Sequence, residues 1–328
     1  MISRGLSRLR GQLSVALHDA QRCKVRRSYD VAQRRRIIIA TDRLSAFDRQ
    51  ITTVPLKGQV LTQLSRFWFD HTQDICPNHV LAYPDPNVVV CQKLEMLPVE
   101  FVVRGYLAGS TATSVLTMYK AGKRQMYGTV FPDGMRDYQE LEKPIVTPTT
   151  KALAAFHDEP LTHEEIVRKG LLDEKTWDQA STFALALFAR GQKIAKENGL
   201  ILADTKYEFG KTPNGQIVLA DEIHTPDSSR YWISATYKER SDAGQMPETL
   251  DKDVVRRWLV ARCDPYKDEI PPIPDAVRME TALAYLSVFE KITGSQIAFP
   301  DPDIDPISRI VTNVTEYLRT QSLSAKLA

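Results

Sequence analysis

One stretch near the middle of this 328-residue chain constrains its fold more than any other. Apolar residues recur at helical spacing over 176–198, and Asn198-Gly199 supplies a stop signal for a helix. Two strand-like runs, LILADTKYEFG and GQIVLADEI, follow directly, and a turn that contains Asn214-Gly215 joins them. The pattern predicts a long helix that leads into a β-hairpin.

Strand-like segments dominate the first third of the chain. The runs at 37–40, 88–94 and 99–107 are rich in β-branched residues, and Pro98 separates the last two as a turn or hinge. Toward the other end of the chain, two helices are expected at 251–262 and 275–292, and two loops rich in Pro and Asp at 264–274 and 299–306. This order of elements predicts an α+β fold rather than a regular βαβ alternation.

Composition narrows the possible partners and location. Apolar residues make up 43% and charged residues 26% of the chain, which is typical of a globular protein with a sizeable core. The formal charge is only +2, so no overall field favours nucleic acid or an anionic membrane as a partner. No apolar run approaches the roughly 18 residues of a membrane helix. The four cysteines show neither CxxC pairing nor zinc-ligand spacing, so we expect reduced thiols and a cytoplasmic protein.

The hairpin predicts a metal site. A two-residue Asn214-Gly215 turn would place Glu208 directly opposite Asp221. Two facing carboxylates are unfavourable unless they share a proton or bind a cation, and magnesium bridged to phosphate suits such a pair. A longer turn enforced by Pro213 would shift the register, and a solvated salt-bridge network is the alternative interpretation.

One face of the first hairpin strand carries alternating charges. Asp204, Lys206 and Glu208 fall at every second position, so they point to the same side and place an ammonium group between two carboxylates. Such a face can bind and orient a phosphoryl group. An exposed face with ordinary salt bridges is again the alternative.

Several long strings resemble motifs of the SAICAR synthetase family, in the order that the family has them. The resemblance runs from about Lys24 to about Gly294, and strings of this length are far more specific than a lone glycine motif. They are ATDRLSAFD, PLKGQVLTQLSRFWF, KLEMLPVEFVVRGYLAGS, TPTTKA, ADTKYEFG and VLADEIHTPDSSRYW.

The resemblance implies a reaction and a fold. The family uses ATP to phosphorylate the carboxylate of CAIR, an aminoimidazole ribonucleotide, and the amine of L-aspartate displaces phosphate to give SAICAR in purine biosynthesis. An acyl phosphate supplies the leaving group that a carboxylate lacks, once Mg²⁺ and cationic side chains neutralise its charge. The implied architecture is α+β, kinase-like and related to ATP-grasp enzymes, with antiparallel sheets and an active-site cleft between two parts.

The resemblance also assigns roles around the hairpin. Glu208 and Asp221 match residues that hold Mg²⁺, and Lys206 matches a lysine beside the transferring phosphoryl group. Asp204 matches a carboxylate that contacts the aminoimidazole of the substrate.

Further matches lie on the substrate and nucleotide sides. Arg104 and Ser110 match residues that bind the CAIR phosphate or nearby polar groups, and Arg230 matches another substrate contact. An arginine fork suits a phosphate dianion geometrically. An isolated arginine would more simply form a surface salt bridge. The other matched positions are Ser45 and Asp48 in a substrate-side loop, Gln92 and Leu94 at an adenine-facing hinge, and Lys24 and Arg26 in a phosphate-covering loop.

The phosphate-covering loop departs from the family pattern. Cys23 stands where the family has Gly, and Arg27 where it has Asp. A side chain at position 23 restricts backbone angles that glycine leaves open, and Arg27 reverses a local charge. Two rival functions stay open. One is another ATP-dependent phosphotransferase on the same fold, because many such enzymes share a lysine, carboxylates and a phosphate loop. The other is a catalytically silent nucleotide-binding protein, in which the changes at Cys23 and Arg27 would have disabled turnover but kept binding.

The sequence also suggests a division into four parts. They are a basic N-terminal extension over 1–20, an ATP-binding α+β subdomain over 21–110, a second α+β subdomain with the hairpin over 111–294, and a C-terminal tail over 295–328. A transit peptide is the alternative interpretation of the first segment. The expected partners are the small molecules CAIR and L-aspartate, and the oligomeric state is left open.

Overall fold

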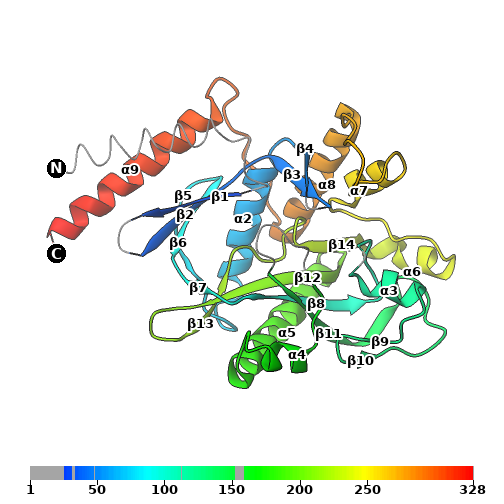
Figure 1. Cartoon of the computed structure of the whole chain (residues 1–328). Helices are drawn as coiled ribbons and strands as arrows, with labels where there is room; N and C mark the ends of the chain where they lie inside the picture. The colour runs from blue at the N-terminus through cyan, green and yellow to red at the C-terminus, as the bar shows by residue number, and fades with distance from the viewer. Residues whose placement is uncertain (1–25, 32–33, 48, 112, 152–158, 328) are drawn as a thin grey trace.

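The expected α+β class is confirmed by the structure, which combines helices with mainly antiparallel sheets (Figure 1). The computed structural model describes residues 26–31, 34–47, 49–111, 113–151 and 159–327, with side chains as far as 321. Cys23, Lys24 and Asp48 lie outside the described residues, as do the extension over 1–20 and the side chain of Arg27.

A small antiparallel sheet has the strand order β1-β2-β6-β5. Alternate residues of β2 point to opposite faces, so Ile37 and Ile39 are fully buried on one face while Ile38 points to the other. Helix α9 covers the first face and helix α2 packs near the second. The elements are β1 (Arg26–Val31), β2 (Arg35–Ala40), β5 (Val80–Asp85), β6 (Val88–Gln92), α2 (Lys57–Asp70) and α9 (Pro306–Leu327).

A larger sheet is built around the long strand β12 (Leu200–Lys211). The first part of β12 pairs with β8 on one side and β14 on the other, and its last part pairs with β7 and β13. Strand β11 extends the sheet beyond β8. These partners are β7 (Glu95–Met96), β8 (Val99–Tyr106), β11 (Glu140–Thr150), β13 (Ile217–Ala220) and β14 (Ser229–Ile233).

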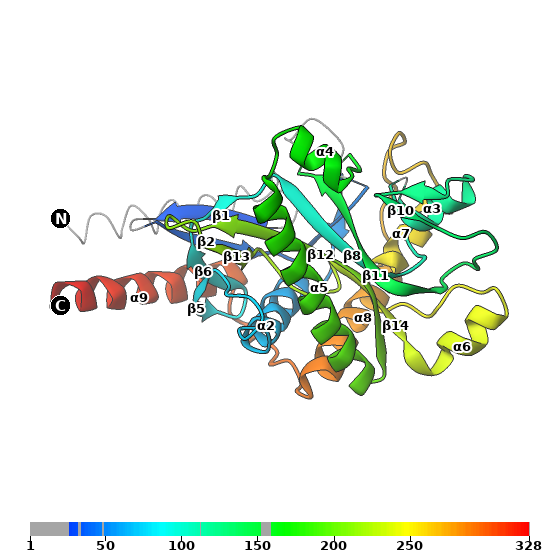
Figure 2. The same cartoon turned by 90° about the horizontal axis from the view of Figure 1, so that it is seen from below.

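Helix α5 (Glu174–Glu197) lies across one face of the large sheet (Figure 2). The Asp173 carboxylate caps its first turn by accepting from the Thr176 amide, and its buried residues join Phe101, Tyr207 and other sheet residues in the main core. The apolar side of the sheet is thereby closed. The charged residues of β8 and β12 lie on the opposite side.

The remaining elements flank the two sheets (Figure 1). The β3–β4 hairpin packs its apolar side chains against α7 and α8. The bounds are β3 (Arg43–Ala46), β4 (Arg49–Thr53), α3 (Val115–Lys120), β9 (Gln125–Met126), β10 (Thr129–Val130), α4 (His163–Arg168), α6 (Ser234–Asp242), α7 (Asp253–Val260) and α8 (Asp275–Thr293). The helices expected at 176–198, 251–262 and 275–292 are thus confirmed within a few residues.

The expected hairpin register is wrong by one residue. Glu208 pairs with Ala220 rather than Asp221, because the turn is longer than two residues. A two-residue turn would need an amide hydrogen at position 213 to bond Gln216, and proline has none. The Thr212 amide donates to the Gln216 carbonyl instead (2.9 Å), and Gly215 takes φ 82°. The carboxylates at 208 and 221 are therefore not cross-strand partners.

Sheet pairing crosses the boundary that the sequence suggested at residue 110. Strand β8 precedes this position, but it pairs with β11 and β12, which follow it. The small sheet ends at Gln92, and the chain enters the large sheet through β7. The tail over 295–328 contains α9, which forms part of a core. Among the described residues, no helix has both the length and the apolar character to cross a bilayer.

Candidate active site

Three neighbouring strands place one charged side chain each in a row. Asp204 of β12 lies between Arg104 of β8 and Arg230 of β14, with which it is in direct register. One of its oxygens, Oδ2, accepts from Arg104 Nη1 at 3.1 Å and from Arg230 Nη1 at 2.6 Å. Arg104 Nε also donates to Thr147 Oγ1 at 2.9 Å.

A β-bulge gives Asp204 its orientation. The register between β12 and β14 shifts between Leu202 and Asp204, so these two residues point to opposite faces although they are two positions apart. Leu202 enters the core under α5, and Asp204 joins the arginine row.

Burial and neighbouring charges shift the pKa values of the two arginines in this row. Burial alone lowers the pKa of Arg230, but the carboxylates of Asp204, Asp253 and Asp251 outweigh it and raise the pKa. For Arg104, burial prevails and the pKa is lowered from its usual value. Two guanidinium groups share one carboxylate, so the row carries excess positive charge.

A second charged group lies farther along β12. Lys206 Nζ donates to Glu208 Oε1 at 2.8 Å and to Glu100 Oε1 at 2.6 Å. The other Glu208 oxygen forms an ion pair with Lys151, which follows β11. Burial raises the pKa of Glu208, but Lys206 and Lys151 more than offset this effect and lower the pKa to about 2. The expected placement of Lys206 beside Glu208 on one strand face is confirmed by this contact.

Asp221 contacts a residue of the small sheet. It follows β13 directly, adopts φ 61°, and forms an ion pair with Arg26 of β1. The same guanidinium pairs with Glu222. Arg26 therefore links the first strand of the small sheet to the end of the hairpin.

A pocket of about 180 Å³ brings these residues together with the expected nucleotide residues. Arg26, Gln92 and Leu94 line it from the small sheet and the connection to β7, while Glu208 and Asp221 line it from the hairpin. Its remaining lining residues are Ser28, Arg36, Ile38, His79, Cys91, Met96, Lys151 and Ala220.

Two predicted substrate residues form no hydrogen bond with this charge network among the described residues. Ser45 Oγ donates to the Arg49 carbonyl across the β3–β4 hairpin at 3.0 Å. Ser110 is exposed after β8. Within the part of the chain that the structure describes, no hydrogen bond joins either serine to Arg104 or Arg230.

Sequence reasoning gave no role to a buried ion pair between a lysine and an aspartate near the site. Lys57 Nζ is completely buried and donates to Asp227 Oδ2 at 2.8 Å, and Tyr285 donates to the other oxygen at 2.7 Å. This cluster ties the turn before β14 to helices α2 and α8. Lys57 and Asp227 both lie inside the strings that resemble family motifs, and this position in the sequence could have marked them as candidate site residues.

Other residues around the site were also missed. Lys151 ends the TPTTKA string, and Glu100 lies in the 93–110 string, but neither had an expected role. Lys252 lies 4.0 Å from Asp227, and burial lowers its pKa to about 8. Asp251 and Asp253 flank it in a DKD string at the start of α7, and both act on Arg230.

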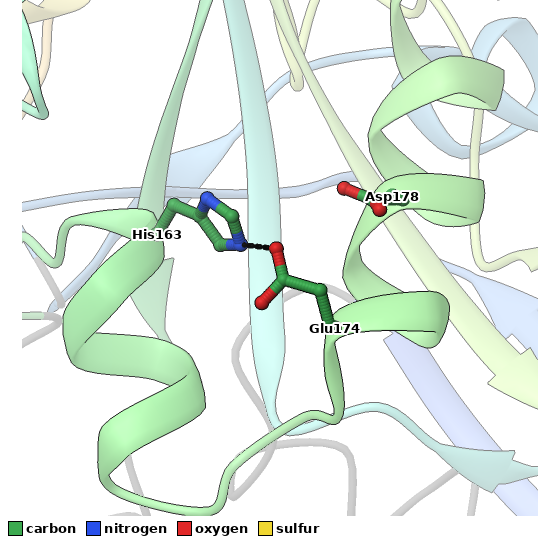
Figure 3. A group of neighbouring side chains, drawn as sticks. All are labelled: His163, Glu174 and Asp178. Atoms are coloured by element: carbon green, nitrogen blue, oxygen red, sulfur yellow. Dashed lines mark ion pairs between the residues drawn. The ribbon is translucent and has the colours of Figure 1, made fainter.

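A separate group of His and carboxylate side chains lies between α4 and α5 (Figure 3). His163 Nε2 is 2.8 Å from Glu174 Oε1, and the imidazole stacks on Trp177. Glu174 and Asp178 are exposed. We interpret this group as a surface ion pair, because no further observation indicates a cation.

The chemistry of the main site suits anions that carry phosphate. The arginine row can hold a phosphate or carboxylate by paired hydrogen bonds, and the Lys206 and Lys151 ammonium groups can offset charge on a transferring group. The carboxylates of Glu208 and Asp221 line the same pocket and offer the oxygen ligands that Mg²⁺ prefers.

Comparison with protein families gives a match over most of the chain. Residues 19–273 match the family model described as SAICAR synthetase. A putative phosphoribosylaminoimidazole-succinocarboxamide synthase 2 from Agrobacterium fabrum is 56% identical over 301 residues, which cover 92% of this chain and 95% of that protein.

Solved structures agree in fold. SAICAR synthase from Saccharomyces cerevisiae, solved with SAICAR, has a TM-score of 0.72 and 30% identity, covering 85% of this chain and 96% of that chain. A SAICAR synthetase solved with ADP has a TM-score of 0.65 and 26% identity, covering 84% of this chain and 98% of that one.

Proposed function

Because this chain belongs to the SAICAR synthetase family, we propose that it joins the carboxylate of CAIR to the amine of L-aspartate, with ATP as the energy source. The family is one of ligases in purine biosynthesis that use ATP. The observation that carries the proposal for this chain is the single pocket lined by Arg26, Gln92 and Leu94 together with Glu208 and Asp221.

The nucleotide is proposed to lie in this pocket. The backbone near Gln92 and Leu94 would meet adenine where the chain passes from the small sheet to the large one. Arg26, with Lys24 before it, would meet the phosphates. This placement would correspond to the kinase-like, ATP-grasp-related cleft between two parts that the family resemblance implies.

The proposed metal is Mg²⁺, which would polarise the terminal phosphates of the nucleotide when bound. Its ligands would be Glu208 and Asp221. Their oxygens fit its preference, although Lys151 and Arg26 compete for them in the free protein. The proposal no longer depends on these carboxylates facing each other across the hairpin, since both line one pocket.

Lys206 and the arginine row would act on the reacting groups. Lys206 lies within hydrogen-bond reach of Glu208 and would offset negative charge as the phosphoryl group moves to the CAIR carboxylate. Arg104 and Arg230 would hold anionic groups of CAIR, and Asp204 would fix both forks and accept from the aminoimidazole. L-aspartate then attacks the acyl phosphate, a carbon–nitrogen bond forms, and phosphate leaves.

Other expectations remain predictions. Ser45, Asp48 and Ser110 are proposed to complete the substrate side, and the division near residue 110 and the cytoplasmic location stay predictions.

A direct assay tests the proposal and separates it from its rivals. Purified protein with ATP, Mg²⁺, CAIR and L-aspartate should form SAICAR, and release of phosphate should require both CAIR and L-aspartate. A different phosphotransferase would release or transfer phosphate when CAIR or L-aspartate is left out. A silent protein would bind ADP without turnover.

The metal assignment makes its own prediction. Glu208→Gln and Asp221→Asn should each raise the Mg²⁺ concentration needed for half-maximal rate and lower kcat by roughly 100-fold, because each removes one anionic ligand. Glu100→Gln is the matched control, since Glu100 also bonds Lys206 but does not line the pocket. An unchanged Mg²⁺ requirement in both site variants would contradict the assignment.

A further inference from the structure

Helix α9 lies outside the part of the chain that the family model matches, yet it packs against one face of the small sheet (Figures 1 and 2). Its inward residues recur at helical spacing and meet β2 and β6. These residues are Ile307, Ile310, Val311, Val314, Tyr317 and Leu318. They cover Ile37, Ile39, Val88 and Val90, each of which is fully buried.

One face of the small sheet packs against α9, and the other face lines the pocket. Ile37 and Ile39 contact α9, while Arg36 and Ile38 line the pocket of the proposed nucleotide site. In β6 the same alternation places Val90 against α9, while Cys91 lines the pocket. The helix therefore supports the wall of the pocket from behind.

A polar anchor fixes α9 at one end of the sheet. Arg309 donates to both Asp85 oxygens, from Nε at 3.0 Å and from Nη2 at 3.2 Å, and Asn313 donates to the same carboxylate at 2.8 Å. The Asp85 side chain is completely buried. A buried carboxylate needs such partners, and α9 supplies the only ion pair that Asp85 makes within the described residues.

The anchor continues into the start of the substrate-side loop. Arg309 Nη2 also donates to Asn87 Oδ1 at 2.6 Å, and Asn87 Nδ2 donates to the Ala40 carbonyl at 3.2 Å. Ala40 ends β2 and lines the small cavity that also contains Arg26 and Asp221. Arg309 is thus joined by two hydrogen bonds in series to Ala40, whose small cavity shares Arg26, Ile38 and Asp221 with the proposed nucleotide pocket.

We propose that Arg309 is a positioning residue for the nucleotide, acting through Asn87 and Ala40 on the sheet wall of the pocket. This inference rests on the nucleotide placement proposed above. Lysine cannot replace arginine here, because one ammonium group lacks the planar fork that reaches Asp85 and Asn87 together.

The test compares three variants of the full chain. Arg309→Met should raise the KM for ATP and the Kd for ADP roughly three- to tenfold, the size of effect expected of a residue one step removed from a ligand. KM values for CAIR and L-aspartate should stay within about twofold of wild type, because no hydrogen bond or ion pair among the described residues joins α9 to the arginine row. Arg309→Lys should lower the melting temperature less than Arg309→Met does, because it keeps a cation beside Asp85, but it should share the weaker ADP binding.

Arg319→Met is the matched control. Arg319 lies on the same helix and pairs only with the exposed Glu316 among the described residues, so its loss should leave ADP binding unchanged. If Arg309→Met does not fold, Arg309→Lys carries the test. An unchanged Kd for ADP in Arg309→Lys, or an equal rise of all three KM values, would overturn the inference.

The outcome also separates this inference from the proposed function. A wild-type protein that binds ADP without making SAICAR would refute the proposed reaction, while weaker ADP binding by the Arg309 variants would still support the positioning role.

Discussion

Each charged side chain of this site has a partner of opposite sign. Glu208 is nearly buried, but two lysines hold its pKa at about 2. Asp204 lies between two guanidinium groups and gains two charge-assisted hydrogen bonds. The site can therefore present fixed charges to an incoming anion with little rearrangement.

A substitution at Arg104 tests whether CAIR binding needs the geometry of the guanidinium group or only its positive charge. Arg104→Lys keeps the charge but cannot reach Asp204 and Thr147 together, so the KM for CAIR should rise roughly tenfold. Steady-state kinetics with each substrate varied in turn will show whether the rise is selective. The control Arg124→Lys changes an arginine of the Asp133 ion pair outside the row. A rise for ATP with CAIR unaffected would move Arg104 to the nucleotide side.

The burial of His224 predicts that the free energy of unfolding falls in mild acid. Its ring is completely buried and contacts the Tyr207 hydroxyl at 2.5 Å, and burial lowers its pKa to about 3. Below about pH 6.5 the unfolded chain binds a proton that the folded chain does not, so the free energy of unfolding falls as pH decreases from 6.5 toward 3.

The effect of His224 can be measured by urea denaturation at pH 7.5 and pH 5. This residue alone should reduce the free energy of unfolding by about 2 kcal/mol at the lower pH. His224→Gln should show a correspondingly smaller loss between the two pH values, whereas His71→Gln, at an exposed position, should behave as wild type. Equal losses in the His224 variant and wild type would refute this account.

Between elements, one close approach joins α5 to the site-bearing strand. A Cβ atom at Gly191 would lie 2.5 Å from His224 Cε1 and 2.7 Å from Leu202 Cδ2. The glycine therefore permits α5 to pack tightly against β12. That contact fixes one face of the strand whose other face carries Asp204, Lys206 and Glu208.

Gly191→Ala should destabilise the protein by roughly 1–3 kcal/mol through overpacking, although alanine favours helices more than glycine does. Thermal and urea denaturation measure the change. Lys193→Ala, an exposed substitution on the same helix, should change stability by no more than about 0.5 kcal/mol. A stabilised Gly191→Ala variant would mean that α5 and β12 can move apart at little cost.

At the scale of the whole molecule, the two sheets meet where the proposed nucleotide site lies. The chain crosses from β6 to β7 at this point, and Asn78 forms a bridge with Leu219 of β13. A ligand in the pocket contacts both sheets at once. Its binding energy therefore opposes separation of the two sheets.

ATP with Mg²⁺ should consequently stabilise the entire protein. At a ligand concentration 100 times the Kd, the expected gain is about 2.7 kcal/mol, seen as a higher melting temperature in differential scanning fluorimetry. Glu208→Gln should lose most of the added shift that Mg²⁺ gives over ATP alone. If Mg²⁺ adds the same shift to both proteins, the metal ligands lie elsewhere.

Local sequence patterns determined the elements and the residue types of the site. The apolar spacing over 176–198 predicted α5, and alternation along β12 put Lys206 and Glu208 on one face. Such features depend on neighbours within a few positions, so periodicity and turn residues reveal them. Resemblance to family strings added candidate roles that periodicity does not supply.

Tertiary structure decided the partners and the register. Lys151 pairs with Glu208 across 57 positions, and Arg26 reaches Asp221 across 195, contacts that depend on how the two sheets meet. Pro213 removed one amide hydrogen and thereby shifted the hairpin by one residue. No helix was predicted for the tail, yet α9 covers the small sheet, because an exposed apolar sheet face is stabilised by the distant segment that covers it.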